Sequence, residues 1–502
     1  MMARCRPAQA WPLADLLAGF AEVDAPQGAY LGVLALAMDS RRVVPGTLFL
    51  ACRGATNHGM IFADQARQRG ALAIAAEPAG AWDLGALADA SARLRLPVIP
   101  VPGLSARASA LADRFYGEPS AHLDVLGVAG VRGKTSVSHF LAQALSRQFP
   151  CGLIGNLGSG FLDGLGPAAA ANAVALQETL AGLCAGGAQA AALALPSADP
   201  HQTAAIRLRQ VIFTQCPAFG LGGGRASDLS GLTWAVLNAD DPNTGAVLAD
   251  LDPGVRVALY GLGAEASEGL SRDLWVGLSA LTTIRRGLRL AVVTSGPDAA
   301  EVEVGVLGSF NAANLLAVLA LLLARGLALR PALQTLARLQ GVPGRMEPFG
   351  GDQAPLVAVD YAHTPDALGE AIANLRRHGQ GRLVTVFGCC GGHDRSVRPL
   401  MGAVAEAGSD LVILTDDNPR GEDGDAIVAG ILAGMSRPET AKVERSRGLA
   451  IRRALALAGT DDTVLVAGMG HEITQDFGEL KVRFSDRAQV VQALREWTGG
   501  RL

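Results

Sequence analysis

The stretch Gly127-Val-Ala-Gly-Val-Arg-Gly-Lys-Thr-Ser136 decides how the rest of the chain is interpreted. It follows a short apolar run, Leu123–Val128, and precedes a helical pattern over Val137–Leu145. In such a strand–turn–helix unit, glycines let backbone N–H groups approach phosphates, the helix N-terminus adds its dipole, and a hydroxyl reaches Mg²⁺. The order predicts a nucleotide-phosphate loop built from Gly130, Gly133, Lys134, Thr135 and Ser136.

Lys134 and Thr135 are the predicted catalytic residues of this loop, with Thr135 as the magnesium ligand. The two glycines are only three positions apart, which is tighter than the usual spacing. The alternative is a glycine-rich turn whose lysine is merely solvated. The order of strand, glycines, lysine, hydroxyl and helix favours the phosphate loop.

Composition describes a globular α/β protein. The 502 residues suffice for about three domains of ordinary size. A net charge of −4 gives no reason to expect a nucleic-acid partner. The seven cysteines show no metal-type spacing, and neither a signal sequence nor an apolar run long enough to span a membrane stands out. We therefore expect a cytoplasmic protein with reduced thiols and no membrane partner.

Strand and helix patterns alternate along the chain, which predicts mostly parallel sheets with ligands at the carboxyl ends of the strands. In the first part, Ser40 and Arg41 follow a predicted strand and could bind a ligand, although a turn-stabilising role for Ser40 is the simpler interpretation. Further along, Asn311 and Asn314 open a long apolar helix, where they could be caps or adenine contacts.

The last part of the chain carries the densest set of polar strand ends. Four predicted strands there each run into a polar segment: Asp360–Asp366, Gly388–Arg395, Asp416–Arg420 and Gly468–Glu472. Any one of them could be an ordinary polar turn. Four in one domain predict a ligand crevice.

Together these motifs resemble the Mur ligases, in particular the branch that adds the third amino acid to the muramoyl peptide. The resemblance is most specific in Asp-Tyr-Ala-His-Thr-Pro-Asp (360–366), Asp-Asp-Asn-Pro-Arg (416–420) and Gly-x-Gly-His-Glu (468–472). It implies an α/β fold with three domains: a UDP-substrate-binding domain over 1–121, a central P-loop ATP-binding domain over 122–340 and a Rossmann-like amino-acid-binding domain over 341–502.

The resemblance also implies a reaction. ATP and Mg²⁺ would activate the carboxylate of a UDP-muramoyl dipeptide as an acyl phosphate, and an amino acid, meso-diaminopimelate by the Asp-Asn-Pro-Arg motif, would attack it in a monomeric enzyme. Asn311, Arg345 and Asp360 would lie near the nucleotide and Ser40 near the uridine. The amino-acid site would comprise His393, Asn418, Arg420, Gly468 and Glu472.

The central part departs from the family pattern. Ala194-Leu-Pro-Ser-Ala198 stands where the family has a magnesium-binding Glu and a His, and the run Ala169–Ala173 replaces a pair of threonines. Gln215–Phe219 replaces another substrate loop, and the segment with the carbamylated lysine is missing between Gly224 and Trp234. His393 and Met469 stand where the family has an arginine and a lysine.

These departures leave two readings open. Either the protein is an active ligase, in which Asp199, His201 or Asp228 replaces the missing magnesium ligand, or it is a decayed or repurposed paralogue that binds nucleotide or wall precursor. A lost metal ligand typically removes several kcal/mol of transition-state stabilisation, so the substitution at Ala194 bears directly on turnover.

Overall fold

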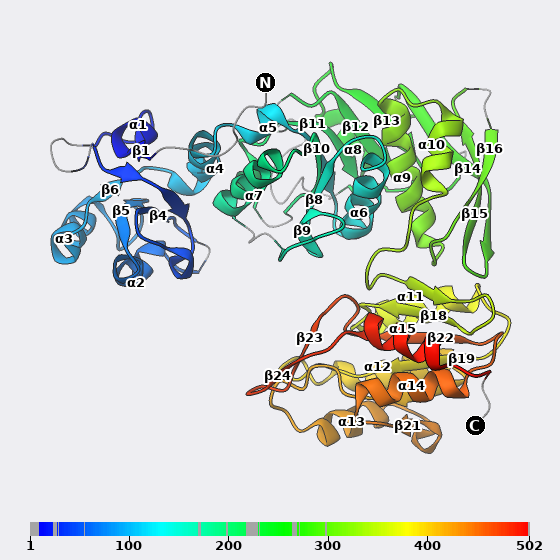
Figure 1. Ribbon diagram of the computed structural model, residues 1–502. Helices are drawn as coiled ribbons and strands as arrows, with labels where there is room; N and C mark the ends of the chain where they lie inside the picture. The colour runs from blue at the N-terminus through cyan, green and yellow to red at the C-terminus, as the bar shows by residue number, and fades with distance from the viewer. Residues whose placement is uncertain are drawn as a thin grey trace. The chain divides into compact units, whose positions relative to one another are not determined.

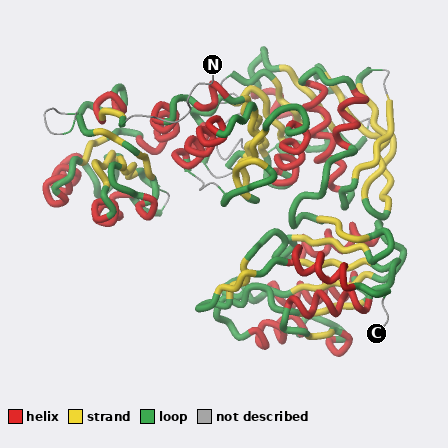
Figure 2. The backbone as a smooth tube through the Cα atoms, viewed as in Figure 1, coloured by secondary structure: helices red, strands yellow, loops and turns green. Residues whose placement is uncertain are grey.

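The structure is a computed structural model that describes residues 10–23, 28, 30–54, 56–168, 172–196, 199–216, 229, 231–263, 269–270, 272–296 and 299–499. The chain forms two compact units, Met1–Leu259 with Gly269–Asp273, and Tyr260–Glu268 with Leu274–Leu502. Residues 122–340 therefore contribute to both units, and the division into three functional domains stays a prediction. Figure 1 labels helices and strands along the chain, and Figure 2 colours them by type. Among the described residues, no helix has the length and apolar character needed to cross a bilayer.

The first unit begins with a four-stranded parallel sheet in the order β3-β4-β5-β6. Its central strand is buried on both faces: Leu48 and Leu50 pack toward α1 and α4, while Phe49 and Ala51 pack toward α2 and α3. A continuous apolar run is typical of such a doubly covered strand. The elements of this part are β1 (Trp11–Pro12), α1 (Leu13–Leu17), β2 (Gly32–Val33), β3 (Ala35–Ala37), η1 (Ser40–Arg42), β4 (Thr47–Ala51), η2 (Gly59–Phe62), α2 (Ala63–Gln68), β5 (Ala71–Ala76), α3 (Leu84–Leu94), β6 (Val98–Pro100) and α4 (Leu104–Phe115).

A second sheet of the first unit carries the glycine loop. This sheet has ten strands, of which those in the first unit follow the order β13-β12-β11-β7-β10-β8-β9, with β7 between two parallel neighbours and β9 returning antiparallel on β8. The carboxyl ends of β7, β10 and β11 therefore meet at one edge. The elements are α5 (Pro119–His122), β7 (Asp124–Ala129), α6 (Lys134–Leu145), β8 (Cys151–Gly155), β9 (Gly158–Phe161), α7 (Ala173–Ala185), β10 (Ala190–Ala194), η3 (Pro200–Thr203), β11 (Leu208–Phe213), β12 (Trp234–Asn238), α8 (Thr244–Asp250) and β13 (Arg256–Tyr260).

The second unit opens with three antiparallel strands that the sequence did not predict. They are β14 (Leu274–Ile284), β15 (Gly287–Thr294) and β16 (Ala299–Val304). The apolar helix predicted at Asn311 follows as α9 (Phe310–Ala324), and α10 (Leu329–Leu336) comes next. Nearly every residue of α9 is buried, which explains why its sequence is apolar on all sides.

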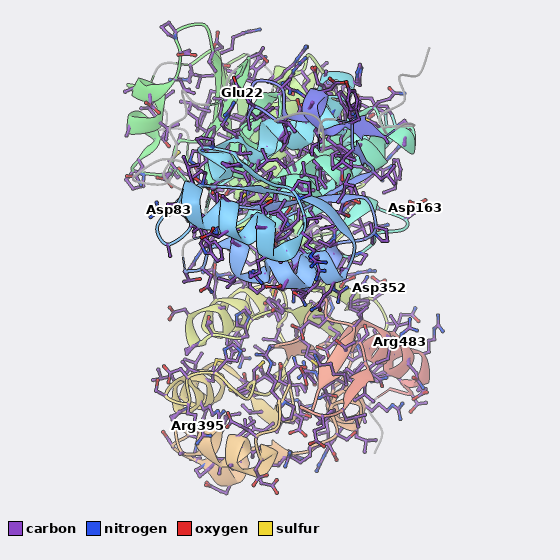
Figure 3. The ribbon with its side chains drawn as sticks, turned by 90° about the vertical axis from the view of Figure 1, so that its left-hand side faces the viewer. Glu22, Asp83, Asp163, Asp352, Arg395 and Arg483 are labelled. Atoms are coloured by element: carbon purple, nitrogen blue, oxygen red, sulfur yellow. The ribbon has the colours of Figure 1, made fainter. Side chains whose placement is uncertain are left out.

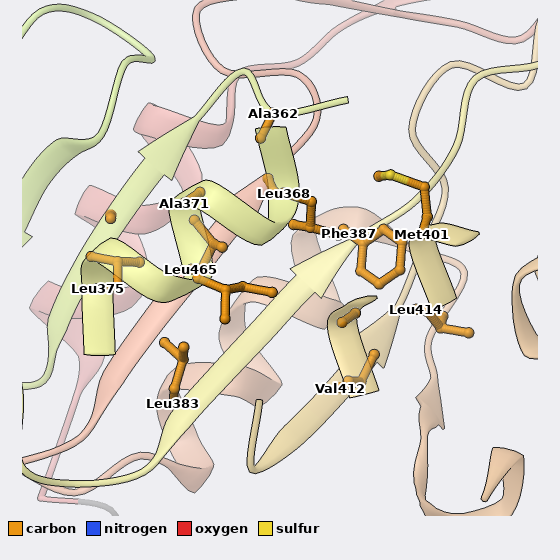
Figure 4. Packing of buried hydrophobic residues seen from close by; sticks show 14 of the residues in the cluster. Ala362, Leu368, Ala371, Leu375, Leu383, Phe387, Met401, Val412, Leu414 and Leu465 are labelled. Carbon is orange, nitrogen blue, oxygen red and sulfur yellow. The ribbon is translucent and has the colours of Figure 1, made fainter. Parts of the chain in front are cut away.

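The rest of the second unit is a three-layer α/β/α structure. Its six-stranded sheet has the order β17-β18-β22-β19-β20-β21, parallel except for β17 at one edge. Side chains of one face pack against α11–α13 around Phe387 and Leu465 (Figure 4), and those of the other face, such as Val384, pack against α14 and α15. The elements are β17 (Glu347–Gly350), β18 (Leu356–Asp360), α11 (Pro365–Arg376), β19 (Leu383–Phe387), α12 (Val397–Gly408), β20 (Leu411–Leu414), α13 (Gly424–Leu432), η6 (Pro438–Thr440), β21 (Lys442–Val443), α14 (Arg447–Leu457), β22 (Thr463–Ala467), β23 (Thr474–Asp476), β24 (Lys481–Arg483) and α15 (Asp486–Glu496).

Candidate active site

The glycine loop has the predicted strand–loop–helix geometry. β7 ends at Ala129, and α6 begins at Lys134, three residues earlier than the sequence pattern suggested. Gly130 and Gly133 have φ angles of 128° and 83°, which only glycine adopts readily, and Gly133 is the N-cap of the helix. A Cβ at Gly130 would overlap Thr214 Oγ1, so glycine at this position lets the loop pack against the residues that follow β11.

Lys134 lies across this loop. Its Nζ donates to the carbonyl oxygen of Gly130 at 2.7 Å, and partial burial lowers the pKa of its ammonium group. Thr135 and Ser136 occupy the first turn of α6, so the lysine, the hydroxyls and the helix N-terminus occur together. The loop residues thus fit a nucleotide phosphate, since they combine backbone donors, a helix dipole and a cation.

The loop is held from the neighbouring strand β11. Thr214 Oγ1 lies 2.6 Å from the carbonyl oxygen of Arg132, and Gln215 Oε1 accepts a hydrogen bond from the backbone N–H of Arg132 at 3.0 Å. Asp241, which follows β12, accepts a hydrogen bond from Cys216 N at 3.0 Å. Gln215, which departs from the family pattern, therefore contributes to the support of the loop.

The described residues offer magnesium an incomplete set of ligands. β10 ends at Ala194 beside β7, and the next residue, Leu195, is buried. Among the residues that the structure describes, no group of three or more His, Cys, Asp or Glu side chains is placed to hold a metal ion. Of the replacement ligands considered, Asp199 accepts a hydrogen bond from His201 N at 2.9 Å, so it caps η3, and Asp228 lies outside the described residues. Thr135 alone provides no carboxylate, and magnesium in proteins is usually held by at least one.

Three other departures fall partly or wholly outside the described residues. They are Ser197 and Ala198, residues 169–171 of the alanine run, and residues 217–228, which include Gly224.

Ser40 is buried in the first unit. Its hydroxyl donates to Gln65 Oε1 at 2.6 Å, and Asp39 caps the short η1 helix by accepting from Arg41 N at 2.9 Å. Asp39 also forms an ion pair with the Arg41 side chain, which holds the pKa of the Asp39 carboxyl below its usual value. These contacts agree with a turn-stabilising role, and the contact of Ser40 with uridine stays a prediction.

In the second unit, Asn311 and Asn314 bond to each other at the start of α9. Asn311 Nδ2 donates to Leu307 O at 2.7 Å, and Asn314 Nδ2 donates to Asn311 Oδ1 at 2.8 Å. Both side chains are buried. They stabilise the helix start, as caps would, and a contact with adenine stays a prediction.

Arg345 and Asp360 lie together at the carboxyl end of β18. Asp360 accepts hydrogen bonds from Met346 N at 2.7 Å and Ala362 N at 2.9 Å, and the guanidinium of Arg345 lies 4.7 Å from the centre of the Tyr361 ring. Burial raises the pKa of the Asp360 carboxyl, while both N–H groups and Arg345 oppose that shift. Asp360 therefore fixes the loop that carries Arg345.

The predicted amino-acid residues come together from three loops. Asn418 Nδ2 donates to Glu472 Oε2 at 2.9 Å, and Asn418 Oδ1 accepts from Asp476 N at 2.8 Å. Arg420 Nη1 lies 2.7 Å from His393 Nε2, so the guanidinium donates to the ring. Asn418 is buried, whereas Arg420 and His393 are exposed. The arrangement sets a carboxylate beside an amide and, at an exposed edge, a guanidinium beside an imidazole.

Gly468 has a structural reason to be glycine. Its φ is 114°, and a Cβ at this position would overlap the carboxylate of Asp417. Asp417 is buried and accepts hydrogen bonds from Asn418 Nδ2 and from the Cys390 thiol, both at 3.0 Å. Met469, at the lysine position of the family motif, is fully buried.

The sequence did not single out several residues that support this site. Tyr361 donates to Glu472 Oε1 at 3.3 Å, and Gln475 Nε2 donates to the Asp417 carbonyl at 2.7 Å. Glu422 accepts from Gly392 N at 2.7 Å and pairs with both Arg398 and the exposed Arg395, which Figure 3 labels. The sequence did offer one signal for Tyr361. It lies in the polar segment Asp360–Asp366, where a polar aromatic side chain is a candidate contact for a ligand.

Comparisons with known proteins agree with this arrangement. Residues 344–470 match the family model described as Mur ligase, glutamate ligase domain, and residues 33–116 match the one described as Mur ligase family, catalytic domain. The UDP-N-acetylmuramoyl-L-alanyl-D-glutamate–2,6-diaminopimelate ligase of Alkalilimnicola ehrlichii is 42% identical over 483 residues, covering 92% of this chain and 95% of that protein. The protein of the same name from Ectopseudomonas mendocina is 41% identical over 478 residues, with the same coverage of 92% and 95%.

Solved structures give the same result for the fold. A structure of a UDP-N-acetylmuramoyl-L-alanyl-D-glutamate–2,6-diaminopimelate ligase aligns with a TM-score of 0.66 and 28% identity over 97% of this chain and 99% of that chain. The UDP-N-acetylmuramoylalanyl-D-glutamyl-2,6-diaminopimelate–D-alanyl-D-alanyl ligase of Acinetobacter baumannii aligns at 17% identity with a TM-score of 0.61 over 98% of this chain and 99% of that chain, and it shows the fold alone. The relatives extend over nearly the whole chain, and the chain belongs to the Mur ligase family.

Proposed function

We propose that this protein is the ATP-dependent ligase that joins meso-diaminopimelate to a UDP-N-acetylmuramoyl dipeptide, and that it acts as a cytoplasmic monomer. The observation that carries the proposal is the 42% identity, over 92% of the chain, to a protein named for that reaction. The polar loops of the second unit add support, because they bring His393, Asn418, Arg420 and Glu472 close together as an amino-acid site requires.

The side chains suit a diamino dicarboxylic acid. A guanidinium can pair with a carboxylate through two parallel hydrogen bonds, which a lysine side chain cannot do, so Arg420 would bind one carboxylate of the amino acid. Glu472, oriented by Asn418, would accept an ammonium group. Gly468 would leave room for the Asp417 carboxylate, which accepts a hydrogen bond from Asn418 Nδ2.

Lys134 and Thr135 of the glycine loop would bind the phosphates of the nucleotide. Asn311 as the adenine contact, and Arg345 and Asp360 as residues near the nucleotide, are part of the same proposal. Lysine charge and helix dipole both stabilise negative charge on a transferring phosphoryl group. No group of three or more His, Cys, Asp or Glu side chains among the described residues is placed to hold the magnesium ion expected for this chemistry, so we assign it no step beyond a contact with Thr135.

The proposal is tested by measuring phosphate release with UDP-N-acetylmuramoyl dipeptide, ATP and meso-diaminopimelate, beside the same assay without diaminopimelate. Amide product that depends on all three substrates supports the ligase. If nucleotide binds but no product forms, the decayed paralogue is the better description. Turnover with another acid or amine would instead indicate a repurposed ligase.

A further inference from the structure

Tyr361 stands at the centre of a cluster that the predicted site did not include. Its hydroxyl donates to Glu472 Oε1 at 3.3 Å, and the guanidinium of Arg345 lies over its ring at 4.7 Å. The ring of His471 is 5.1 Å away in a tilted arrangement, and that of His363 is 4.7 Å away at its edge. One phenol thus touches a residue assigned to the amino acid and a residue assigned to the nucleotide.

The position of the phenol is fixed by the backbone on both sides. Asp360 accepts hydrogen bonds from Met346 N and Ala362 N, which ties the residues flanking Tyr361 to the loop of Arg345. On the other side, a Cβ at Gly470 would lie 2.8 Å from Tyr361 Cβ, so the Gly-His-Glu turn packs directly against it. Tyr361 therefore has little freedom to move away from either partner.

Glu472 is held at both carboxylate oxygens. Tyr361 donates to Oε1 and Asn418 donates to Oε2, and each oxygen keeps a further lone pair for another donor. The two bonds fix the orientation of the carboxylate, and its remaining lone pairs can accept hydrogen bonds from an ammonium group. A separation of 3.3 Å is long for a hydroxyl bond, and such bonds in active sites commonly shorten when the substrate is bound.

The imidazole of His471 adds no second positive charge beside Arg345. Burial, together with the nearby Arg345 and Arg487, lowers the pKa of His471 to about 4. Its ring therefore packs against Tyr361 in the neutral form at neutral pH. The attraction between the Arg345 cation and the phenol face is therefore not opposed by a charge on His471.

We propose that Tyr361 is a positioning residue with two separable roles: its hydroxyl orients Glu472 for the amino acid, and its ring orients Arg345 for the nucleotide. The inference rests on the proposed function, since it assigns the two partners to the two substrates of that reaction. The inference adds to the proposed function by predicting that one side chain contributes to the binding of both substrates.

Two variants separate the roles. Tyr361→Phe keeps the ring and removes the hydroxyl, so KM for meso-diaminopimelate is expected to rise about tenfold while KM for ATP stays within about twofold. Tyr361→Leu removes the ring as well, so KM for ATP is expected to rise about tenfold too. Tyr30→Phe, at a tyrosine that is 89% exposed, is the matched control, and thermal melting of each variant reports any loss of folding.

Each outcome decides the matter. Unchanged KM for diaminopimelate in Tyr361→Phe overturns the role of the hydroxyl, and unchanged KM for ATP in Tyr361→Leu overturns the role of the ring. Equal rises in both KM values for Tyr361→Phe, with a lower melting temperature, would show a purely structural residue. If the wild type does not turn over, the proposed function fails. Calorimetry then measures the affinity of the wild type and of Tyr361→Phe for diaminopimelate. Equal affinity in the two proteins, or no binding to either, overturns the inference.

Discussion

At the scale of single residues, the predicted site is a set of side chains that already bond to one another. Lys134 Nζ bonds the Gly130 carbonyl, Asn418 bonds Glu472, and Arg420 bonds His393. Each of these contacts joins groups that would also bind charged parts of a substrate. A substrate would have to replace or share these bonds, so the loss of one member affects its partner as well as the ligand.

Lys134→Ala is expected to abolish measurable binding of ADP and leave the fold intact. The substitution removes a cation from the glycine loop, and a charge-assisted hydrogen bond contributes about 1.5–3 kcal/mol. Calorimetry with ADP measures the effect, and Lys442→Ala on β21 in the second unit serves as the matched control. Equal ADP affinity in Lys134→Ala and the wild type would contradict the assignment of this loop.

The amino-acid site is expected to prefer meso-diaminopimelate to lysine. Lysine lacks the second carboxylate that Arg420 would pair with, and Arg420→Lys should weaken diaminopimelate binding by about 1–3 kcal/mol because the planar fork is lost. Calorimetry with both amino acids, on the wild type and on Arg420→Lys, checks the preference. Tighter binding of lysine to the wild type would refute it.

At the scale of elements, the apolar strands were the most predictable part of the fold. Apolar runs in the sequence coincide with the strands Thr47–Ala51, Ala71–Ala76, Leu383–Phe387 and Thr463–Ala467. These strands are covered on both faces, so their sequences are continuous apolar runs bounded by polar turns. The same property explains why the polar ends of the strands could be found, since the carboxyl ends of parallel strands share an edge.

Other parts of the fold and site could not be predicted in this way. The pairing of β14 with β15 shifts register between Leu278 and Ala280, which interrupts the alternation of buried and exposed residues that marks such a strand. The contact of Tyr361 with Glu472 joins residues 111 positions apart. This contact depends on the conformations of two loops, and the spacing of residues in the sequence does not predict those conformations.

The start of α9 illustrates how one element is fixed by its neighbours. His378 Nε2 accepts from Gly308 N at 3.0 Å, so its Nδ1 carries the proton and donates to Ile284 O at 2.7 Å. The buried ring therefore joins the end of β14, the turn before α9 and the end of α11. Asn374 adds a second link by accepting from Ser309 N at 2.9 Å.

His378→Ala is expected to lower the free energy of unfolding by about 2–4 kcal/mol, because two buried backbone groups lose their partner. Burial lowers the pKa of His378 below 6.5, so the unfolded chain binds a proton that the folded chain does not. The contribution of His378 to the free energy of unfolding is fully present above the pKa of the histidine in the unfolded chain. It is lost as the pH falls below that value. Urea unfolding at several pH values measures both effects. The wild type and His378→Ala are compared, with His122→Ala at the exposed His122 as the control. An unchanged midpoint in His378→Ala would contradict both expectations.

At the scale of the whole molecule, buried thiols set the expected response to alkaline pH. Burial raises the pKa of Cys52, Cys389 and Cys390 to about 12 and that of Cys216 to about 11, from an ordinary value of 9.0. The folded chain thus keeps protons that the unfolded chain releases. The contribution of the protonated thiols to the free energy of unfolding is fully present below their pKa in the unfolded chain. It is lost as the pH rises toward their pKa values in the folded chain.

The other shifted groups that titrate in this range do not cancel the effect. Burial and the nearby Glu472 also raise the pKa of Tyr361, which adds to the alkaline loss. The lowered pKa of Lys134 acts in the opposite direction, as a single group. The net slope is therefore set by the thiols, which lie in both compact units.

The free energy of unfolding is accordingly expected to fall between about pH 9 and about pH 11, by at most about 1.4 kcal/mol per pH unit for each thiol. Urea unfolding in the presence of a reductant measures this slope. Cys216→Ala should flatten it by the share of one thiol, whereas Tyr30→Phe, which removes an exposed phenol, should leave the thiol share unchanged. A stability that does not change over this range, or a slope that Cys216→Ala does not alter, would show that the thiols ionise as readily in the folded chain as in the unfolded one.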